Sequence, residues 1–67
     1  MRYAELVSLA ECYGFTLNRQ KGSHAMYTRK GFARLMVFQD VKGMAKAYQV
    51  RQLLDALREL GLIEAKD

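Results

Sequence analysis

Residues 15–38 have the sequence FTLNRQKGSHAMYTRKGFARLMVF, which contains the strongest local signals for the fold. It contains two glycine turns, at Lys21-Gly22-Ser23 and at Lys30-Gly31. Glycine adopts a positive φ at little steric cost, so each turn suits a tight connection between antiparallel strands. The stretch therefore predicts two hairpins in succession, which together make a three-stranded antiparallel sheet.

The segments around these turns have the patterns of strands. Residues 15–19 alternate apolar and polar side chains, and residues 34–38 do so less cleanly. Residues 25–28 lie between the two turns and are too few to form a helix. Each of the three segments is therefore predicted to be a strand.

A helix is predicted on each side of the strands. Residues 2–13 form an amphipathic helix that ends at Gly14, and a second helix runs from near Ala45, without a strong N-cap, to Gly61. The apolar positions that recur every three or four residues are Tyr3, Leu6, Val7, Ala10 and Tyr13, and then Val50, Leu53, Leu54, Leu57 and Leu60. Both helices can bury these stripes against one face of the sheet, which predicts a two-layer α+β sandwich whose other face is open.

Length and composition predict one small globular domain, residues 1–67. The chain has 67 residues without proline, and its 51% hydrophobic and 27% charged residues exclude a disordered class. The single Cys12 excludes an internal disulfide. No apolar run approaches the roughly 18 residues of a membrane span, and the first residues do not resemble a signal peptide. We therefore expect a cytoplasmic protein that does not enter a membrane.

Positive charge is concentrated in the middle of the chain. The net charge is +4, and Asp40 is the only acidic residue between Arg19 and Arg51. The basic residues of this segment are Arg19, Lys21, Arg29, Lys30, Arg34, Lys42, Lys46 and Arg51. Such a concentration favours a polyanion, because each neutralised phosphate releases counterions. The alternative is a solvated basic face that keeps a small domain in solution.

Several chemistries lack the residues that they need. One histidine and one cysteine cannot supply the four ligands of a structural zinc site, and a two-metal nuclease needs a carboxylate cluster that the basic middle lacks. The sequence contains neither a Walker loop nor a dinucleotide-binding fingerprint. We therefore expect neither a metal nor a cofactor.

His24 is the strongest candidate for chemistry. It is the single histidine, and it follows the turn formed by residues 20–23, with basic residues on both sides. An imidazole, whose ordinary pKa is about 6.5, can accept and donate a proton near neutral pH. It can take the proton of an RNA 2′-hydroxyl while Lys21 and nearby arginines hold the phosphate, and this internal attack needs no metal. The alternative is a hydrogen-bonded histidine with a structural role.

Gly14-Phe15, Arg19-Gln20-Lys21-Gly22-Ser23-His24 and Tyr27 resemble the signature of the HicA (YcfA-like) toxins of bacterial toxin–antitoxin systems. The resemblance extends over nearly the whole chain, and Gly-Ser-His preceded by Arg-Gln-Lys is its specific part. It implies a fold like that of a double-stranded RNA-binding domain and an mRNA-cleaving endoribonuclease. It also implies that His24 is catalytic, that Gly22 and Ser23 shape its turn, and that a HicB-like antitoxin covers the active surface.

The candidate RNA-binding residues lie where the positive charge concentrates. They are Arg19, Lys21, Gly22, Ser23, Arg29, Lys30, Arg34, Lys46 and Arg51. The last two are included because double-stranded RNA-binding folds contact phosphates near this helix. Tyr27 and Phe32 can stack on bases, or they can pack in the core.

Two positions depart from the family pattern. Where the family has a proline and, two residues on, a second histidine, this chain has Phe38 and Asp40. Asp40 places an anion where a phosphate would bind, so it either weakens binding or bonds to a basic neighbour.

Two other functions fit the same sequence. One is a non-catalytic RNA-binding module of the same fold, which would retain RNA without cleaving it. The other is a protein that uses the open sheet face or the sheet edge to bind a protein partner. This last function predicts no RNA binding at ~150 mM salt, where weak electrostatic contacts are screened. The sequence leaves the oligomeric state open.

Overall fold

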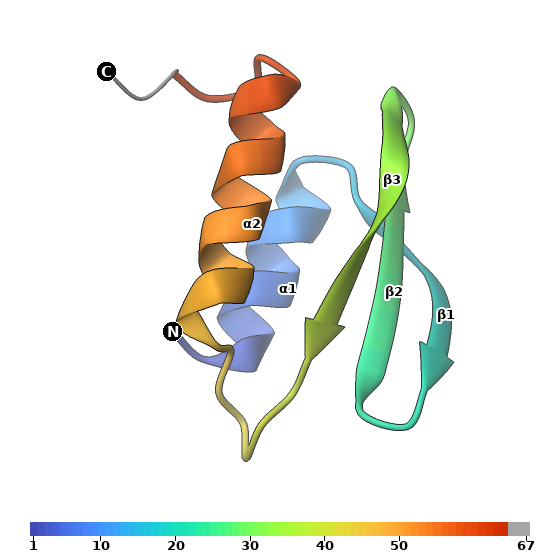
Figure 1. Ribbon diagram of the computed structural model, residues 1–67, viewed down its shortest axis with the longest axis vertical. Helices are drawn as coiled ribbons and strands as arrows, with labels where there is room; N and C mark the ends of the chain where they lie inside the picture. The colour runs from blue at the N-terminus through green and yellow to red at the C-terminus, as the bar shows by residue number, and fades with distance from the viewer. Residues whose placement is uncertain (65–67) are drawn as a thin grey trace.

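The computed structural model describes residues 1–64 and confirms the expected order of elements. The elements are α1 (Tyr3–Cys12), β1 (Thr16–Lys21), β2 (His24–Arg29), β3 (Phe32–Gln39) and α2 (Ala47–Glu59). Both helices lie on the same side of the three-stranded sheet, which gives a two-layer α+β arrangement (Figure 1). The predicted domain also includes residues 65–67, which lie outside the described residues.

The sheet has the order β1-β2-β3, and both strand pairs are antiparallel. Each hairpin has a two-residue turn, since Lys21 pairs with His24 and Arg29 pairs with Phe32. Gly22 has a φ of 60°, which provides the positive φ that the first turn requires. The strands extend further than the predicted segments because the ladders continue up to both turns.

Glycine motifs end both helices as predicted. At the end of α1, the N–H of Phe15 donates to the carbonyl of Ala10 at 3.1 Å, and that of Gly14 donates to Glu11 at 3.0 Å. At the end of α2, the N–H of Leu62 donates to the carbonyl of Leu57 at 2.9 Å, the hydrogen bond of a Schellman motif with Gly61 at its turn. These bonds use carbonyls that the helix itself leaves without partners.

Helix α2 begins at Ala47 and not near Ala45, so the predicted start is wrong by two residues. The N–H of Ala45 donates to the carbonyl of Met1 at 3.0 Å, so Ala45 is hydrogen-bonded to the N-terminal segment and lies outside the helix. Lys46 is the N-cap, with extended backbone and no capping bond from its side chain. A tertiary contact, rather than a local capping signal, therefore sets the start of α2.

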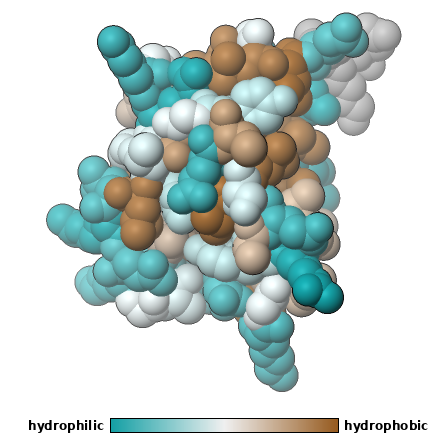
Figure 2. Space-filling view, turned by 180° about the vertical axis from the view of Figure 1, so that it is seen from behind, coloured by the Kyte–Doolittle hydropathy of each residue, from teal (hydrophilic) through white to brown (hydrophobic). Residues whose placement is uncertain are grey.

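The core lies between the helices and one face of the sheet. Its buried hydrophobic side chains are Leu6, Ala10, Phe15, Ala25, Tyr27, Met36, Phe38, Leu53, Ala56 and Leu57. Tyr27 is therefore a core residue, and Phe32 packs edge-on against Phe15 with ring centres 5.7 Å apart. On the side of the molecule seen in Figure 2, hydrophilic side chains interrupt the hydrophobic areas. Neither helix of the described residues combines the length and the apolar character needed to cross a membrane.

Candidate functional site

His24 lies on the open face of the sheet, at the start of β2. Its side chain is exposed, whereas Ala25 and Tyr27 on the same strand are buried in the core. Side chains alternate between the two faces of a strand, so His24 and Met26 are on the face opposite the helices. His24 and Tyr27 therefore lie on different faces of the sheet, and the imidazole is accessible from solvent.

A row of three polar side chains crosses the sheet at His24. Lys21 on β1 is paired with His24 on one side, and Gln39 on β3 is paired with it on the other. Directly opposite residues share a face of the sheet, with Cβ atoms about 4.5–5.5 Å apart. We call these three residues the polar row. It places a cation and a neutral amide on either side of the imidazole.

The turn before His24 is attached to the end of β3 through Ser23. The backbone N–H of Asp40 donates to the carbonyl of Ser23 at 3.3 Å. The side-chain amide of Gln39 donates to Ser23 Oγ at 3.4 Å. Within the turn, Gln20 Nε2 also donates to the carbonyl of Gly22 at 3.2 Å. Gly22 and Ser23 therefore do shape the turn that presents His24, as expected.

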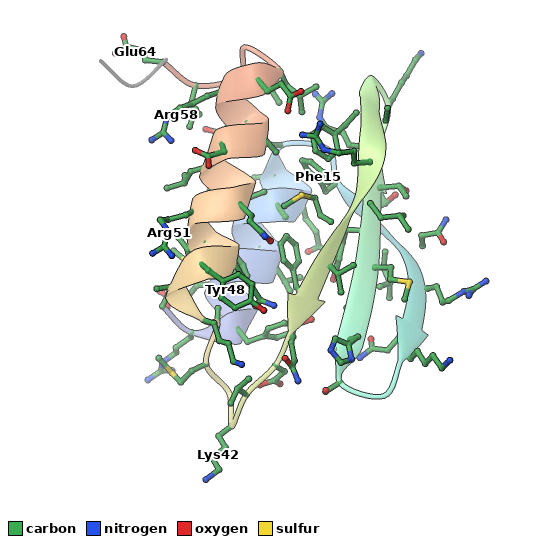
Figure 3. All side chains as sticks on the ribbon, in the orientation of Figure 1. Phe15, Lys42, Tyr48, Arg51, Arg58 and Glu64 are labelled. Carbon is green, nitrogen blue, oxygen red and sulfur yellow. The ribbon has the colours of Figure 1, made fainter. Side chains whose placement is uncertain are left out.

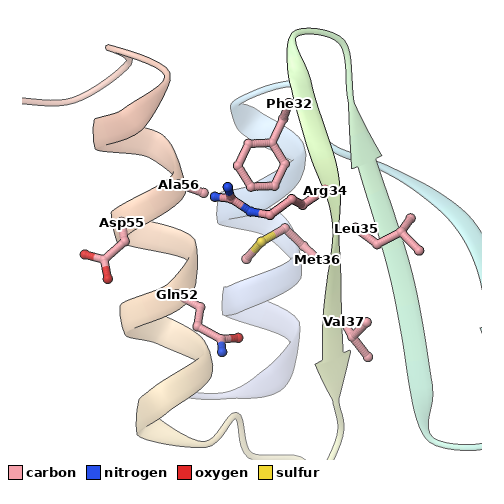
Figure 4. A pocket seen from close by; sticks show the side chains of 8 residues that line it. All are labelled: Phe32, Arg34, Leu35, Met36, Val37, Gln52, Asp55 and Ala56. Carbon is pink, nitrogen blue, oxygen red and sulfur yellow. The ribbon is translucent and has the colours of Figure 1, made fainter.

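The rest of the open face is basic and aliphatic. Arg19 pairs with Met26, which places Arg19 on this face beside the polar row. Leu35 and Val37 point away from α2 and are 53% and 38% exposed (Figure 4). None of the three strands contains an aspartate or a glutamate. The face therefore combines positive charge with an exposed aliphatic strip.

The loop between β3 and α2 brings further positive charge to the same end of the molecule. The ribbon places this loop and the β1–β2 turn at one end (Figure 1). Lys42 projects from the tip of the loop (Figure 3), where its φ of 52° is one that lysine rarely adopts. Lys46, at the start of α2, is exposed. The end that carries the polar row therefore also carries two loop lysines.

Three predicted RNA-binding residues lie at the opposite end of the sheet. Arg29 is five residues along β2 from His24, a rise of about 17 Å, and Lys30 follows it in the turn. The guanidinium of Arg29 bonds to the carbonyls of Tyr13 and Lys30. Arg34 forms an ion pair with Glu59 at 2.6 Å. These three residues therefore lie away from His24, and both arginines already bond to other groups of the chain.

Arg51 is likewise apart from the polar row. It lies on α2 with its side chain exposed and directed away from the sheet (Figure 3). Arg51 therefore lies on a different side of the molecule from His24 and the turn that precedes it.

The two departures from the family pattern have structural roles. Phe38 is fully buried and packs against Tyr27, with ring centres 5.4 Å apart. The carboxylate of Asp40 accepts a hydrogen bond from the backbone N–H of Gly43 at 2.7 Å. Asp40 is therefore bonded to its own loop, and neither ion pair found among the described residues includes it.

A groove of about 260 Å³ lies between β3 and α2, away from the polar row. Phe32, Arg34 and Met36 line this groove from the strand, and Gln52 lies on the helix side of it (Figure 4). Among the described residues, no group of three or more His, Cys, Asp or Glu side chains is placed to hold a metal ion. The groove contains no nucleophile–base pair, so the polar row remains the best candidate site.

Two tyrosines near the core have altered acidity. Burial raises the pKa of Tyr3, and the neighbouring Tyr27 and Asp40 raise it further. Burial also raises the pKa of Tyr27, with a smaller contribution from Glu11. Both phenols therefore remain protonated and neutral across the range in which an imidazole titrates.

Gln39 is not among the residues predicted from the sequence, and Lys42 is counted there as a basic residue but not as a candidate RNA-binding residue. A regular ladder continued from the Arg29–Phe32 pair would place Val37 opposite His24, but an irregularity between Tyr27 and Arg29 shifts the register and places Gln39 there. For Lys42 a signal was available. Lys42-Gly43 is a turn sequence between two bridge-forming residues, and it marks an exposed basic tip.

Comparisons of the chain with protein-family models, with curated proteins and with solved structures found no match.

Proposed function

We propose that this chain is a metal-independent endoribonuclease of the HicA type, the toxin of a toxin–antitoxin pair, with His24 as its catalytic residue. One observation carries the proposal: an exposed imidazole lies beside Lys21 on a sheet face whose strands contain no acidic residue. An unobstructed base next to a cation suits a phosphodiester, whose negative charge increases during cleavage. The motif around His24 supports the same function.

The proposed reaction is an internal transfer of the phosphoryl group. His24 accepts the proton of the RNA 2′-hydroxyl, and the 2′-oxygen forms a bond to phosphorus. The bond from phosphorus to the 5′-oxygen breaks, and the leaving oxygen takes a proton from water. The products are a 2′,3′-cyclic phosphate and a 5′-hydroxyl. Lys21 stabilises the charge that builds up on the phosphoryl oxygens.

RNA binding is proposed to centre on the end of the molecule that carries the polar row. Arg19 and Lys21 lie on the open face, and Lys42 and Lys46 lie in the adjoining loop and cap. The order of one helix, three strands and a second helix supports a likeness to double-stranded RNA-binding domains. Exposed aromatic side chains for base stacking are absent from the open face among the described residues. We therefore propose mRNA recognition mainly through the backbone.

The proposed protein partner is a HicB-like antitoxin that binds over the open face. Leu35 and Val37 present aliphatic surface beside His24's strand, and RNA phosphates do not complement such surface. A partner with apolar side chains flanked by carboxylates complements both the strip and the basic residues Arg19 and Lys21. Such a partner would exclude RNA from His24 directly.

The test is incubation of purified protein with a defined mRNA in EDTA, beside the variants His24→Ala and Lys30→Ala. We expect cleavage by the parent and by Lys30→Ala, whose substitution is exposed and remote, and none by His24→Ala. Cleavage by His24→Ala at the parental rate would remove His24 from the mechanism. If none of the three cleaves but all retain RNA in a gel, the chain is a non-catalytic RNA-binding module. If none retains RNA, the protein-partner function stands alone.

A further inference from the structure

Gln39 completes the polar row on the side of His24 opposite to Lys21. It pairs directly with His24 across the β2–β3 ladder, at the last position of β3. Its side-chain amide carries two N–H donors, and one of them is directed to Ser23 Oγ at 3.4 Å. That distance is beyond the usual range for an N–H to oxygen bond, and the contact is exposed. The amide is therefore available to a ligand at little cost.

We infer that Gln39 is a further catalytic residue of the proposed ribonuclease: its side-chain amide donates a hydrogen bond to a non-bridging phosphoryl oxygen. This inference rests on the proposed function and extends it to a residue outside the recognised motif. As the 2′-oxygen attacks, negative charge accumulates on the two non-bridging oxygens. Lys21 stabilises this charge from one side of His24, and Gln39 does so from the other.

The spacing of the polar row suits this division of roles. Opposite Cβ atoms on neighbouring strands are about 4.5–5.5 Å apart, so the two outer side chains flank the imidazole at the distance of directly opposite residues. The outer two members are donors, whereas the central imidazole is the base. A neutral amide adds a donor without adding a group that titrates, so its removal should leave the pH dependence of cleavage unchanged.

A purely structural role for the Gln39 side chain is a weaker explanation. The turn before His24 is already joined to β3 through the backbone, because the N–H of Asp40 donates to the carbonyl of Ser23. The contact between Gln39 and Ser23 Oγ joins two flexible side chains at the surface, whereas the contact between Asp40 and Ser23 joins backbone groups, which have less freedom to move.

The experiment compares the variants Gln39→Ala and Gln39→Glu with the parent in RNA cleavage across pH. We expect Gln39→Ala to lower kcat on the order of 10- to 100-fold, since loss of one such donor in a buried site costs about 100- to 1000-fold. KM should stay within roughly twofold of the parent value, and the pH midpoint of kcat should stay within roughly 0.3 of a pH unit. Both limits are about the precision of such profiles. Gln39→Glu should be no better than Gln39→Ala, because a carboxylate accepts rather than donates.

Two results would overturn this inference while leaving the proposed function intact. One is a parental kcat in Gln39→Ala. The other is a rise in KM or a shift in the pH midpoint as large as the fall in kcat, which would mean that Gln39 acts only by ordering the turn before His24. Absence of cleavage by the parent would instead remove the proposed function, and the role of Gln39 with it. Circular dichroism of each variant establishes that the chain is folded in every comparison.

Discussion

The Arg29 side chain on β2 donates a hydrogen bond from Nε to the carbonyl oxygen of Tyr13, the C-cap of α1. The end of a helix carries carbonyls without partners and the negative end of the helix dipole, both of which favour a cation. A second bond runs from the same guanidinium to the carbonyl of Lys30 at 2.7 Å. One arginine thus joins the end of α1 to the β2–β3 hairpin.

Arg29→Met should therefore destabilise the protein without changing the polar row. The loss of charge-assisted hydrogen bonds at a part-buried site is expected to lower the free energy of unfolding by about 1.5–3 kcal/mol. Urea denaturation followed by circular dichroism measures the change. The free energy of unfolding of Arg29→Lys should fall between those of the parent and Arg29→Met. An unchanged midpoint in Arg29→Met would show that the helix end does not need this contact.

Gly14→Ala should cost more stability than Gly22→Ala. Both glycines have positive φ, 92° and 60°, so an alanine at either position is strained by about 1–2 kcal/mol. A Cβ at Gly14 would also lie 3.3 Å from Arg29 Nε, whereas a Cβ at Gly22 meets nothing within 4 Å. Thermal or urea unfolding of both variants gives the comparison. Equal losses would mean that the Arg29 side chain moves aside freely.

Lys21→Ala should weaken RNA binding more than Lys30→Ala does. The two lysines are equal in charge and both exposed, but Lys21 is next to His24 and Lys30 is in the turn at the far end of the sheet. Loss of one phosphate contact should reduce the slope of log affinity against log salt by about 1. Filter binding to a fixed RNA at several salt concentrations measures this slope. If Lys30→Ala shows the larger change, RNA binds at the other end.

Asp40→Asn and Asp40→Ala should separate the effect of the Asp40 hydrogen bond on stability from the effect of its negative charge on RNA binding. Asparagine can still accept the hydrogen bond from the N–H of Gly43, so the loop should hold, while alanine should cost about 1 kcal/mol of stability. Removal of the negative charge next to Gln39 should raise RNA affinity in both variants. Unfolding and filter-binding measurements give the two quantities. Lower affinity in Asp40→Asn would mean that the anion assists RNA binding.

Stability should fall in alkaline solution because of Tyr3 and Tyr27. Burial raises the pKa of both phenols above the ordinary value of 10.0 that they regain on unfolding. At pH values between 10 and the raised folded-state pKa, the folded state holds more protons than the unfolded state, so the free energy of unfolding falls as the pH rises. The contribution of the two protonated phenols to stability is fully present below pH 10 and is lost as the pH rises through the folded-state pKa. Tyr27→Phe should show a shallower decline from pH 9 to 11 than the parent in urea titrations at each pH, and an equal decline would contradict this origin.

The sequence predicts the arrangement of elements well because the determining signals are local. Two glycine turns specify the hairpins, and Gly14 and Gly61 end the helices where expected. Strict alternation along β2 separates His24 from Tyr27, so the exposure of the catalytic candidate follows from the sequence as well.

Features that depend on tertiary contacts do not follow from the sequence. The register shift between Tyr27 and Arg29 decides that Gln39 faces His24, and nothing in the local pattern marks it. In the sequence Arg29 is indistinguishable from the other basic residues, yet its guanidinium donates a hydrogen bond to the carbonyl of Tyr13 at the end of α1. The start of α2 depends on a bond between Ala45 and Met1, residues far apart in the chain.

In the proposed mechanism, His24 acts as the base in metal-free attack by a 2′-oxygen. The rate at which 2′,3′-cyclic phosphate ends appear, when parent and His24→Ala are incubated with the same RNA in EDTA, measures this role. We expect cyclic phosphate and 5′-hydroxyl ends from the parent, none above background from His24→Ala, and comparable RNA binding by both. Formation of 5′-phosphate ends, or of cyclic phosphate by His24→Ala at the parental rate, would contradict this mechanism.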